Sequence, residues 1–210
     1  MAVRRAGILV LAAGLLLPGP FCAAQSTQEK DLGLGKILIM QRNVPDPHFA
    51  HSVILLAKFD RTGSLGLMLH YRSDMSIRKA LAGMKGAENR TDTLFVGGPV
   101  EMQGVLALLR SDVPPEDASH VAGKLYLLTS KQSISAALAD KKRKPGDLHV
   151  YLGYTGWAAG QLEREVRLNG WYIFDYDQSL VFDEHPETLW DRLIARTELQ
   201  KVLFRLPPPR

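Results

Sequence analysis

Cysteine is almost absent from this chain, since Cys22 is the only one among its 210 residues. It lies in an N-terminal segment that we expect to be removed on export, which would leave the mature chain without any cysteine. Disulfide bonds and thiolate catalysis are then excluded for the mature chain, although an exported protein enters an oxidising compartment. Lipidation of Cys22 is the alternative, but the bulky Phe21 stands where lipoprotein signals have a small residue.

The N-terminal apolar run is too short to cross a membrane. It covers residues 6–17 and so has 12 residues, whereas a transmembrane helix needs about 20. Two arginines precede the run, and a Pro-Gly-Pro breaker and two alanines follow it. This pattern predicts a signal peptide over residues 1–24, cleaved after Ala24. We therefore expect a periplasmic or secreted protein with no membrane span after cleavage.

A strong excess of one charge is also missing. The chain has 26 basic and 22 acidic residues, a formal net charge of +4. Removal of the two arginines near the N-terminus leaves 24 basic residues against 22 acidic ones. A balance this close to neutral argues against nucleic acid as a partner. The one basic run, residues 141–144, precedes a Pro-Gly pair and predicts a solvated turn.

Motifs for nucleophilic catalysis are absent as well. The sequence contains neither a Gly-x-Ser-x-Gly elbow nor a phosphate-binding loop, so no catalytic residue and no cofactor is predicted. A triad assembled in space stays open. Asp46, His48 and His51 offer metal-binding groups. On a strand the two histidines would point to opposite faces, and no second cluster completes four ligands, so no metal site is predicted.

The remaining sequence has the patterning of one globular domain. Residues 25–35 are polar and glycine-containing, which predicts a flexible lead, followed by a domain over residues 36–200 and a proline-rich tail over residues 201–210. Short β-branched and apolar runs predict strands at residues 37–40, 52–58, 65–70, 93–96, 105–109, 125–129, 148–152, 171–174 and 180–182. The last two of these strands are expected to form a closing hairpin.

Helices are predicted at four places. They begin after Ser76, at 134–139 with Ser133 as the N-cap, after residues 153–157, and behind Pro186. Strands outnumber helices and do not alternate with them strictly. The fold class is therefore predicted to be α+β.

Two glycine-containing segments are the candidate ligand-binding site. Successive glycines after a strand let backbone N–H groups approach a ligand, whereas their structural explanation is a tight turn. The second segment places aromatic and polar side chains at a helix start, where they could form a pocket or, equally, could pack in the core and cap backbone. The candidate residues are Gly97, Gly98, Pro99, Tyr154, Trp157, Gln161 and Glu163.

Three stretches, in this order and spacing, make the chain resemble the YqgE/AlgH family. They are Asp46-Pro47-His48-Phe49 running into Ser52-Val53-Ile54-Leu55-Leu56, then Gly97-Gly98-Pro99-Val100, then Gly153-Tyr154-Thr155-Gly156-Trp157 with Gly160-Gln161-Leu162-Glu163. The similarity continues through Glu165, Asn169, Trp171, Phe182 and Trp190. The resemblance implies a mixed, bifurcated β-sheet that curls into a flattened pseudo-barrel with helices packed outside.

The chain departs from the family at two of these places. The family usually has an asparagine where this chain has His70, and a proline where it has Ala159. Most relatives also lack a signal peptide and are cytoplasmic, so this chain would be a divergent, exported member. Some relatives are described as regulators of exopolysaccharide synthesis, a description that defines no molecular activity.

The leading hypothesis is a non-enzymatic binding or regulatory protein of the cell envelope, with an unidentified protein or small molecule as partner. Two alternatives remain open. One is an enzyme with Tyr154, Gln161 and Glu163 around a pocket, and the other is a transcriptional regulator, as suggested for relatives.

Overall fold

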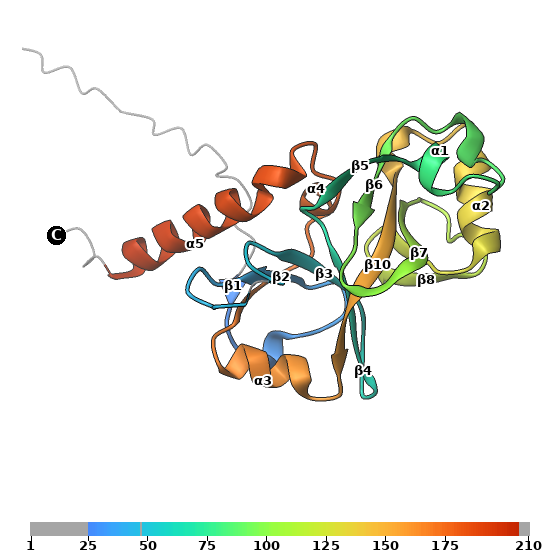
Figure 1. Cartoon of the computed structure of the whole chain (residues 1–210). Coiled ribbons are helices and arrows are strands. Elements are labelled where there is room, and N and C mark those ends of the chain that lie inside the picture. Colours follow the sequence, from blue (N-terminus) through green and yellow to red (C-terminus); the bar gives the residue numbers. More distant parts are fainter. Residues whose placement is uncertain (1–24, 47, 206–210) are drawn as a thin grey trace, which may run out of the picture.

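A computed structural model describes residues 25–46 and 48–205 of the chain. Within them the strands form one curled sheet of eleven strands with helices packed against it, which confirms the expected α+β class (Figure 1). The main path of the sheet runs β1-β11-β2-β3-β4-β10-β7-β9-β8, and β5 and β6 branch from it. β6 and β10 are the one parallel pair among these described strands, so the sheet is mixed.

The first half of the sheet is antiparallel. Its strands are β1 (Gln25–Ser26), β2 (Ile37–Met40), β3 (Val53–Asp60), β4 (Gly63–Met68) and β11 (Trp171–Phe174). All four residues of β2 and of β11 are buried, because both faces of these strands are covered. The predicted strands at 37–40, 52–58 and 171–174 are thereby confirmed.

The second half continues from the same sheet. Its strands are β5 (Arg72–Ser76), β6 (Thr93–Val96), β7 (Val100–Arg110), β8 (Ala118–Ala122) and β9 (Leu125–Leu128). The sequence prediction missed β5 and β8. Their residues are mostly exposed or half-buried, so they lack the continuous apolar run by which the other strands were found.

Strand β10 (Leu148–Ala158) joins the two halves of the sheet. Its first part pairs with β7 and β6, and its last part pairs with β4 at Thr155–Ala158. The sheet therefore divides at β10, as the family resemblance implied. Helix α3 (Gln161–Arg167) follows residues 153–157, as predicted, although Thr155 to Ala158 still belong to β10 because they pair with β4.

Five α-helices flank the sheet in the described chain. They are α1 (Ile77–Ala80), α2 (Lys131–Ala139), α3 (Gln161–Arg167), α4 (Gln178–Val181) and α5 (Leu189–Arg205). Four short 3-10 turns complete the structure: η1 (Glu29–Asp31), η2 (Ala87–Asn89), η3 (Pro145–Asp147) and η4 (Pro186–Thr188). In the part of the chain that the structure describes, no helix is long and apolar enough to span a membrane.

Helix starts agree with the sequence at two places and differ at one. Ser76 caps α1 by accepting a hydrogen bond from the Lys79 N–H, and Pro186 begins the turn before α5. The cap of α2 is Ser130, whose hydroxyl accepts from the Ser133 N–H at 3.1 Å. Ser133 is inside the helix and buried, so the N-cap assigned to it is wrong.

The predicted closing hairpin does not form. Residues 180–182 fall in and after α4, whose N-cap Asp177 accepts from the N–H and the hydroxyl of Ser179. One edge of β11 pairs with β2 and the other with β1, so neither edge is left for a returning strand. The same pairing ties Gln25 and Ser26 to the sheet, in contrast to the flexible lead expected at residues 25–35.

The C-terminal boundary also differs from expectation. The backbone of α5 is helical through Arg205, so residues 201–205 belong to the helix and not to an irregular tail. The predicted signal peptide at 1–24 and the end of the tail at 206–210 lie outside the described residues.

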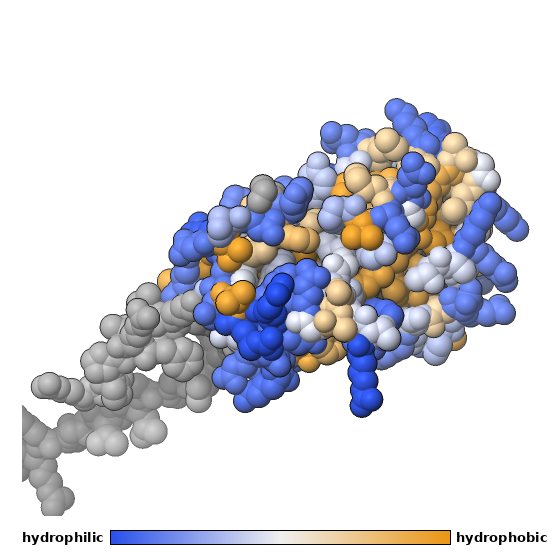
Figure 2. All heavy atoms as spheres, turned by 60° about the horizontal axis from the view of Figure 1, so that its bottom comes forward, coloured by the Kyte–Doolittle hydropathy of each residue, from blue (hydrophilic) through white to orange (hydrophobic). Residues whose placement is uncertain are grey.

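Hydrophobic side chains gather in three clusters on the two faces of the sheet. One cluster packs beneath α5 and α4, a second beneath α1 and α2, and the third beneath α3. Figure 1 shows α3 at the opposite end of the molecule from α1 and α2. On the face seen in Figure 2, hydrophobic residues concentrate in the right-hand half, framed by hydrophilic side chains.

Candidate functional site

The first candidate segment, Gly97 to Pro99, connects β6 to β7 beside β10. The Gly97 N–H donates to the Leu152 carbonyl at 2.8 Å, and the Gly97 carbonyl accepts from the Met68 N–H at 3.0 Å. A Cβ on Gly97 would lie 2.2 Å from the Gly153 carbonyl oxygen, and one on Gly98 would lie 2.4 Å from that of Tyr154. The two glycines are therefore required by close backbone packing.

The second segment contributes to a hydrogen-bond network around a carboxylate that the sequence analysis did not select. One oxygen of Glu165 accepts from the indole N–H of Trp157 at 3.0 Å and from that of Trp171 at 2.9 Å. Its other oxygen accepts from the Gln161 side-chain amide at 3.1 Å. The side-chain carbonyl oxygen of Gln161 in turn accepts from the Ala158 N–H at 3.2 Å. These contacts fasten α3 to β10 and β11.

Trp157 is 5% exposed and belongs to the core cluster beneath α3. Its ring stacks against Phe49 at 6.3 Å between centroids and meets Trp171 edge-on at 6.1 Å. Trp157 and Gln161 therefore have the structural role that the sequence left open as an alternative. Glu163 lies in the first turn of α3 and takes no part in the bonds to the two indoles.

Tyr154 lies elsewhere, on the part of β10 that faces Glu101. Its hydroxyl donates to the Glu101 carboxylate at 3.3 Å. Desolvation and the nearby Glu101 carboxylate raise the pKa of Tyr154. The tyrosine lines an open hollow of about 400 Å³ together with Val100, Gly156 and Trp157. The structure thus brings Tyr154 and Trp157 to one hollow, whereas Gly98 and Pro99 line another.

Gly98 and Pro99 line a different hollow, of about 300 Å³, which we call the Gly98 hollow. Its lining passes from buried residues to fully exposed ones, so it opens to the surface. Tyr71 and Met102 at its rim are 56% and 62% exposed, which is unusual for such large apolar side chains. The Gly98 hollow is lined by His48, Ala50, Ser52, Met68, His70, Tyr71, Val96, Gly98, Pro99 and Met102.

Two polar side chains in the Gly98 hollow have hydrogen-bonding capacity to spare. Ser52 is 1% exposed, and its hydroxyl has no partner in the described part of the chain. The Nδ1 atom of His70 accepts from the Val53 N–H at 3.3 Å. Burial lowers the pKa of His70, so the ring is neutral near pH 7. Sequence reasoning did not select either residue for a site, because Ser52 precedes β3 and His70 follows β4, 18 positions later in the sequence.

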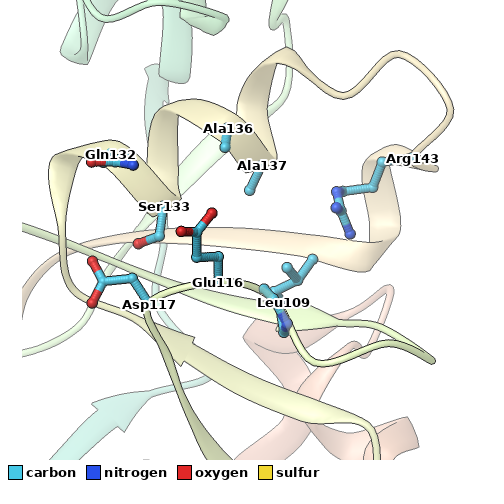
Figure 3. A pocket seen from close by; sticks show the side chains of 9 residues that line it. Leu109, Glu116, Asp117, Gln132, Ser133, Ala136, Ala137 and Arg143 are labelled. Atoms are coloured by element: carbon cyan, nitrogen blue, oxygen red, sulfur yellow. The ribbon is translucent and has the colours of Figure 1, made fainter.

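Two further hollows are less suited to a ligand. One, of about 130 Å³, lies between α2 and the segment before β8, where Figure 3 shows Glu116 facing Ser133 and Arg143 entering from the other end. Arg143 is already paired with Asp140 at 3.1 Å. The other, of about 380 Å³, includes His149, whose burial between Phe95 and Phe182 lowers its pKa to about 4.

The three side chains considered as metal ligands, those of Asp46, His48 and His51, do not form one site. Asp46 accepts from the backbone N–H groups of His48 and Phe49, so its carboxylate closes a turn. His51 packs on Trp190 with 4.2 Å between ring centroids. Over residues 25–46 and 48–205, no group of three His, Cys, Asp or Glu side chains has a geometry for holding a metal ion.

Comparison with known proteins identifies the family. A family model described as AlgH-like (DUF179) matches residues 37–201, which is most of the chain. The chain belongs to the AlgH-like family. Its relatives in that family include a UPF0301 protein of Xylella fastidiosa strain M23, 35% identical over 178 residues that cover 82% of this chain and 92% of the relative. Another, from Chlorobium phaeobacteroides, is 30% identical over 161 residues, covering 76% and 84%.

Solved structures agree with this membership. The solution structure of the AlgH protein from Pseudomonas aeruginosa covers 84% of this chain and 95% of its own, with 26% identity and a TM-score of 0.65. Protein DIP2367 of Corynebacterium diphtheriae shares the fold at 20% identity and the same TM-score. The names of these proteins state no reaction, so a function has to be inferred from the geometry of the site.

Proposed function

We propose that this protein is a non-enzymatic binding protein of the cell envelope and that it holds a small molecule in the Gly98 hollow. The observation that carries the proposal is the exposure of Tyr71 and Met102 on the rim of one hollow. Large apolar side chains that remain open to water around a concave surface are typical of ligand sites. A volume of about 300 Å³ is at the lower end of the range for such sites, about 300–1,000 Å³.

The hydrogen bond that His70 makes favours a binding role over catalysis. A serine nucleophile needs a base hydrogen-bonded to its hydroxyl. Ser52 and His70 line the same hollow, but Nδ1 of His70 accepts from the Val53 N–H instead. The envelope location is supported by the signal-peptide pattern of residues 1–24.

The chain carries its own reporters for a test of this site. Met68 and Met102 line the Gly98 hollow, whereas Met40 and Met84 pack in the clusters beneath α3 and α2. The full chain would be expressed with ¹³C-methyl methionine, purified and titrated with 1-hexanol. We expect saturable shifts of the Met68 and Met102 methyl signals and constant signals for Met40 and Met84. No shift, or equal shifts at all methionines, would reject the site.

A matched pair of variants separates the hollow from general surface hydrophobicity. Tyr71→Ala removes part of the rim and should weaken 1-hexanol binding several-fold. Leu168→Ala removes an equally apolar side chain that is 75% exposed beyond the end of α3. Binding should be unchanged in Leu168→Ala, and an equal loss in both variants would contradict the proposal.

A further inference from the structure

The chemistry of the ligand can be inferred from the inner wall of the Gly98 hollow. Ser52 is nearly inaccessible to solvent, and its hydroxyl meets no hydrogen-bond partner among the described residues. A buried hydroxyl without a partner lowers the stability of a protein. A ligand group that formed a hydrogen bond with this hydroxyl would therefore gain binding free energy, because solvent does not supply that bond.

A second donor comes from His70. Because its Nδ1 accepts from the Val53 N–H at 3.3 Å, the proton of the neutral ring is on Nε2. The hydrogen bond of His70 within residues 25–46 and 48–205 is made by Nδ1, and the ring lines the hollow. The hollow therefore offers an N–H donor from His70 and an O–H donor from Ser52.

The lining carries no fixed charge. It contains no Lys, Arg, Asp or Glu, and its two histidines are His48, which is exposed, and His70, which is partly buried. A carboxylate or ammonium group placed beside Ser52 would lose its hydration without meeting an opposite charge. The wall thus favours an uncharged acceptor.

We propose that the Gly98 hollow binds an uncharged molecule with an apolar chain next to a carbonyl group, that is, an acyl amide or an acyl ester. The carbonyl oxygen accepts from the Ser52 hydroxyl and from Nε2–H of His70. The chain packs on Met68, Val96 and Met102 towards the rim. This inference rests on the proposed function and specifies the class of ligand for the same site.

Three probes of equal chain length test the inference: hexanamide, methyl hexanoate and hexanoate at pH 7.5. The readout is the shift of the Met68 and Met102 methyl signals in the full chain. We expect hexanamide and methyl hexanoate to bind about tenfold more tightly than hexanoate, because only hexanoate is charged. An affinity for hexanoate equal to or greater than that for both uncharged probes would overturn the inference.

The outcomes separate this inference from the function it rests on. If 1-hexanol shifts the two methionines but neither carbonyl probe binds more tightly than 1-hexanol, the ligand class is wrong and the site stands. If none of the four probes shifts Met68 or Met102, the proposed function itself is wrong.

Variants test the two donors individually. Ser52→Ala should weaken hexanamide binding about fivefold, as expected for one lost hydrogen bond, and Ser119→Ala on the exposed face of β8 should not. His70→Asn keeps an acceptor for Val53 and a donor for the ligand, so it should retain affinity within about twofold. His70→Leu has no donor and should weaken hexanamide binding about as much as Ser52→Ala, so unchanged binding in His70→Leu would contradict the role of His70. Thermal unfolding verifies that each variant is folded.

Discussion

Glu165 is the residue on which the attachment of α3 depends. Its carboxylate accepts three side-chain hydrogen bonds, two from buried indoles and one from Gln161. Glu165→Ala should lower the free energy of unfolding by about 2–4 kcal/mol, because both indole N–H groups lose their acceptor in the core. Chemical denaturation measures the change.

The matched control is Glu163→Ala, two positions earlier on the same helix. It should stay within about 0.5 kcal/mol of the wild type, since Glu163 makes none of these bonds. An equal loss of unfolding free energy in the two variants would show that the hydrogen bonds of Glu165 do not contribute to stability.

Gly98 gives a second prediction at the residue scale. Its φ of +153° disfavours side chains, and an added Cβ would collide with the Tyr154 carbonyl group. Gly98→Ala should therefore cost about 3 kcal/mol or more. Gly146, where a Cβ meets nothing within 4 Å, is the control, and Gly146→Ala should be nearly neutral. A mild effect of Gly98→Ala in denaturant unfolding would refute the packing argument.

The candidate residues show how far local sequence reasoning extends. It selected Trp157 and Gln161 for their chemistry, and both do take part in a polar–aromatic network. It selected Glu163 as a polar group at the helix start, whereas the network uses Glu165. Gln161 and Glu165 are four residues apart on a helix and share a face. The i, i+4 spacing is therefore the signal by which Glu165 could have been identified as the partner. Ser52 and His70 line one hollow because β3 and β4 pair, and no local pattern reveals that pairing.

At the scale of elements, the start of α2 is a sharp test of the capping assignment. The Ser130 hydroxyl accepts from the Ser133 N–H, so Ser130→Ala should cost about 1 kcal/mol. Ser130→Asp retains an acceptor and places a negative charge at the helix N-terminus, so it should be close to neutral. Thermal unfolding of both variants measures the change. An unchanged stability of Ser130→Ala would show that Ser130 is not the N-cap of α2.

The strands that the sequence predicted are those with continuous apolar, β-branched runs, such as β2, β3 and β11. The elements it missed or mistook depend on long-range pairing. Residues 153–157 were predicted only as the lead into a helix, yet Thr155 to Trp157 pair with β4 in a strand. Residues 180–182 have strand-like composition, but β1 already occupies the edge of β11 that they would need.

At the scale of the whole molecule, the shared strand β10 connects two parts of the sheet, and the Gly98 hollow lies where β4, β6 and β7 converge beside it. The overall fold followed from the family resemblance and not from periodicity alone. Local patterns indicate most of the buried strands, whereas the division of the sheet at β10 arises from pairings between residues far apart in the chain.

Export is the prediction that concerns the chain as a whole. The full-length chain, expressed in a bacterium and separated into cytoplasmic, periplasmic and membrane fractions, should be recovered from the periplasm. Intact-mass measurement should give a product that begins at or near Gln25. An unprocessed cytoplasmic chain would contradict the envelope location and favour the regulator hypothesis for relatives.

A crystal structure of the purified protein with bound hexanamide would show whether the Gly98 hollow is a ligand site with Ser52 and His70 as its donors. We expect hexanamide in the hollow, with its carbonyl oxygen about 2.7–3.2 Å from Ser52 Oγ and from His70 Nε2. Hexanamide bound at another surface, or in the hollow with its carbonyl turned away from both donors, would show that these residues do not form the site.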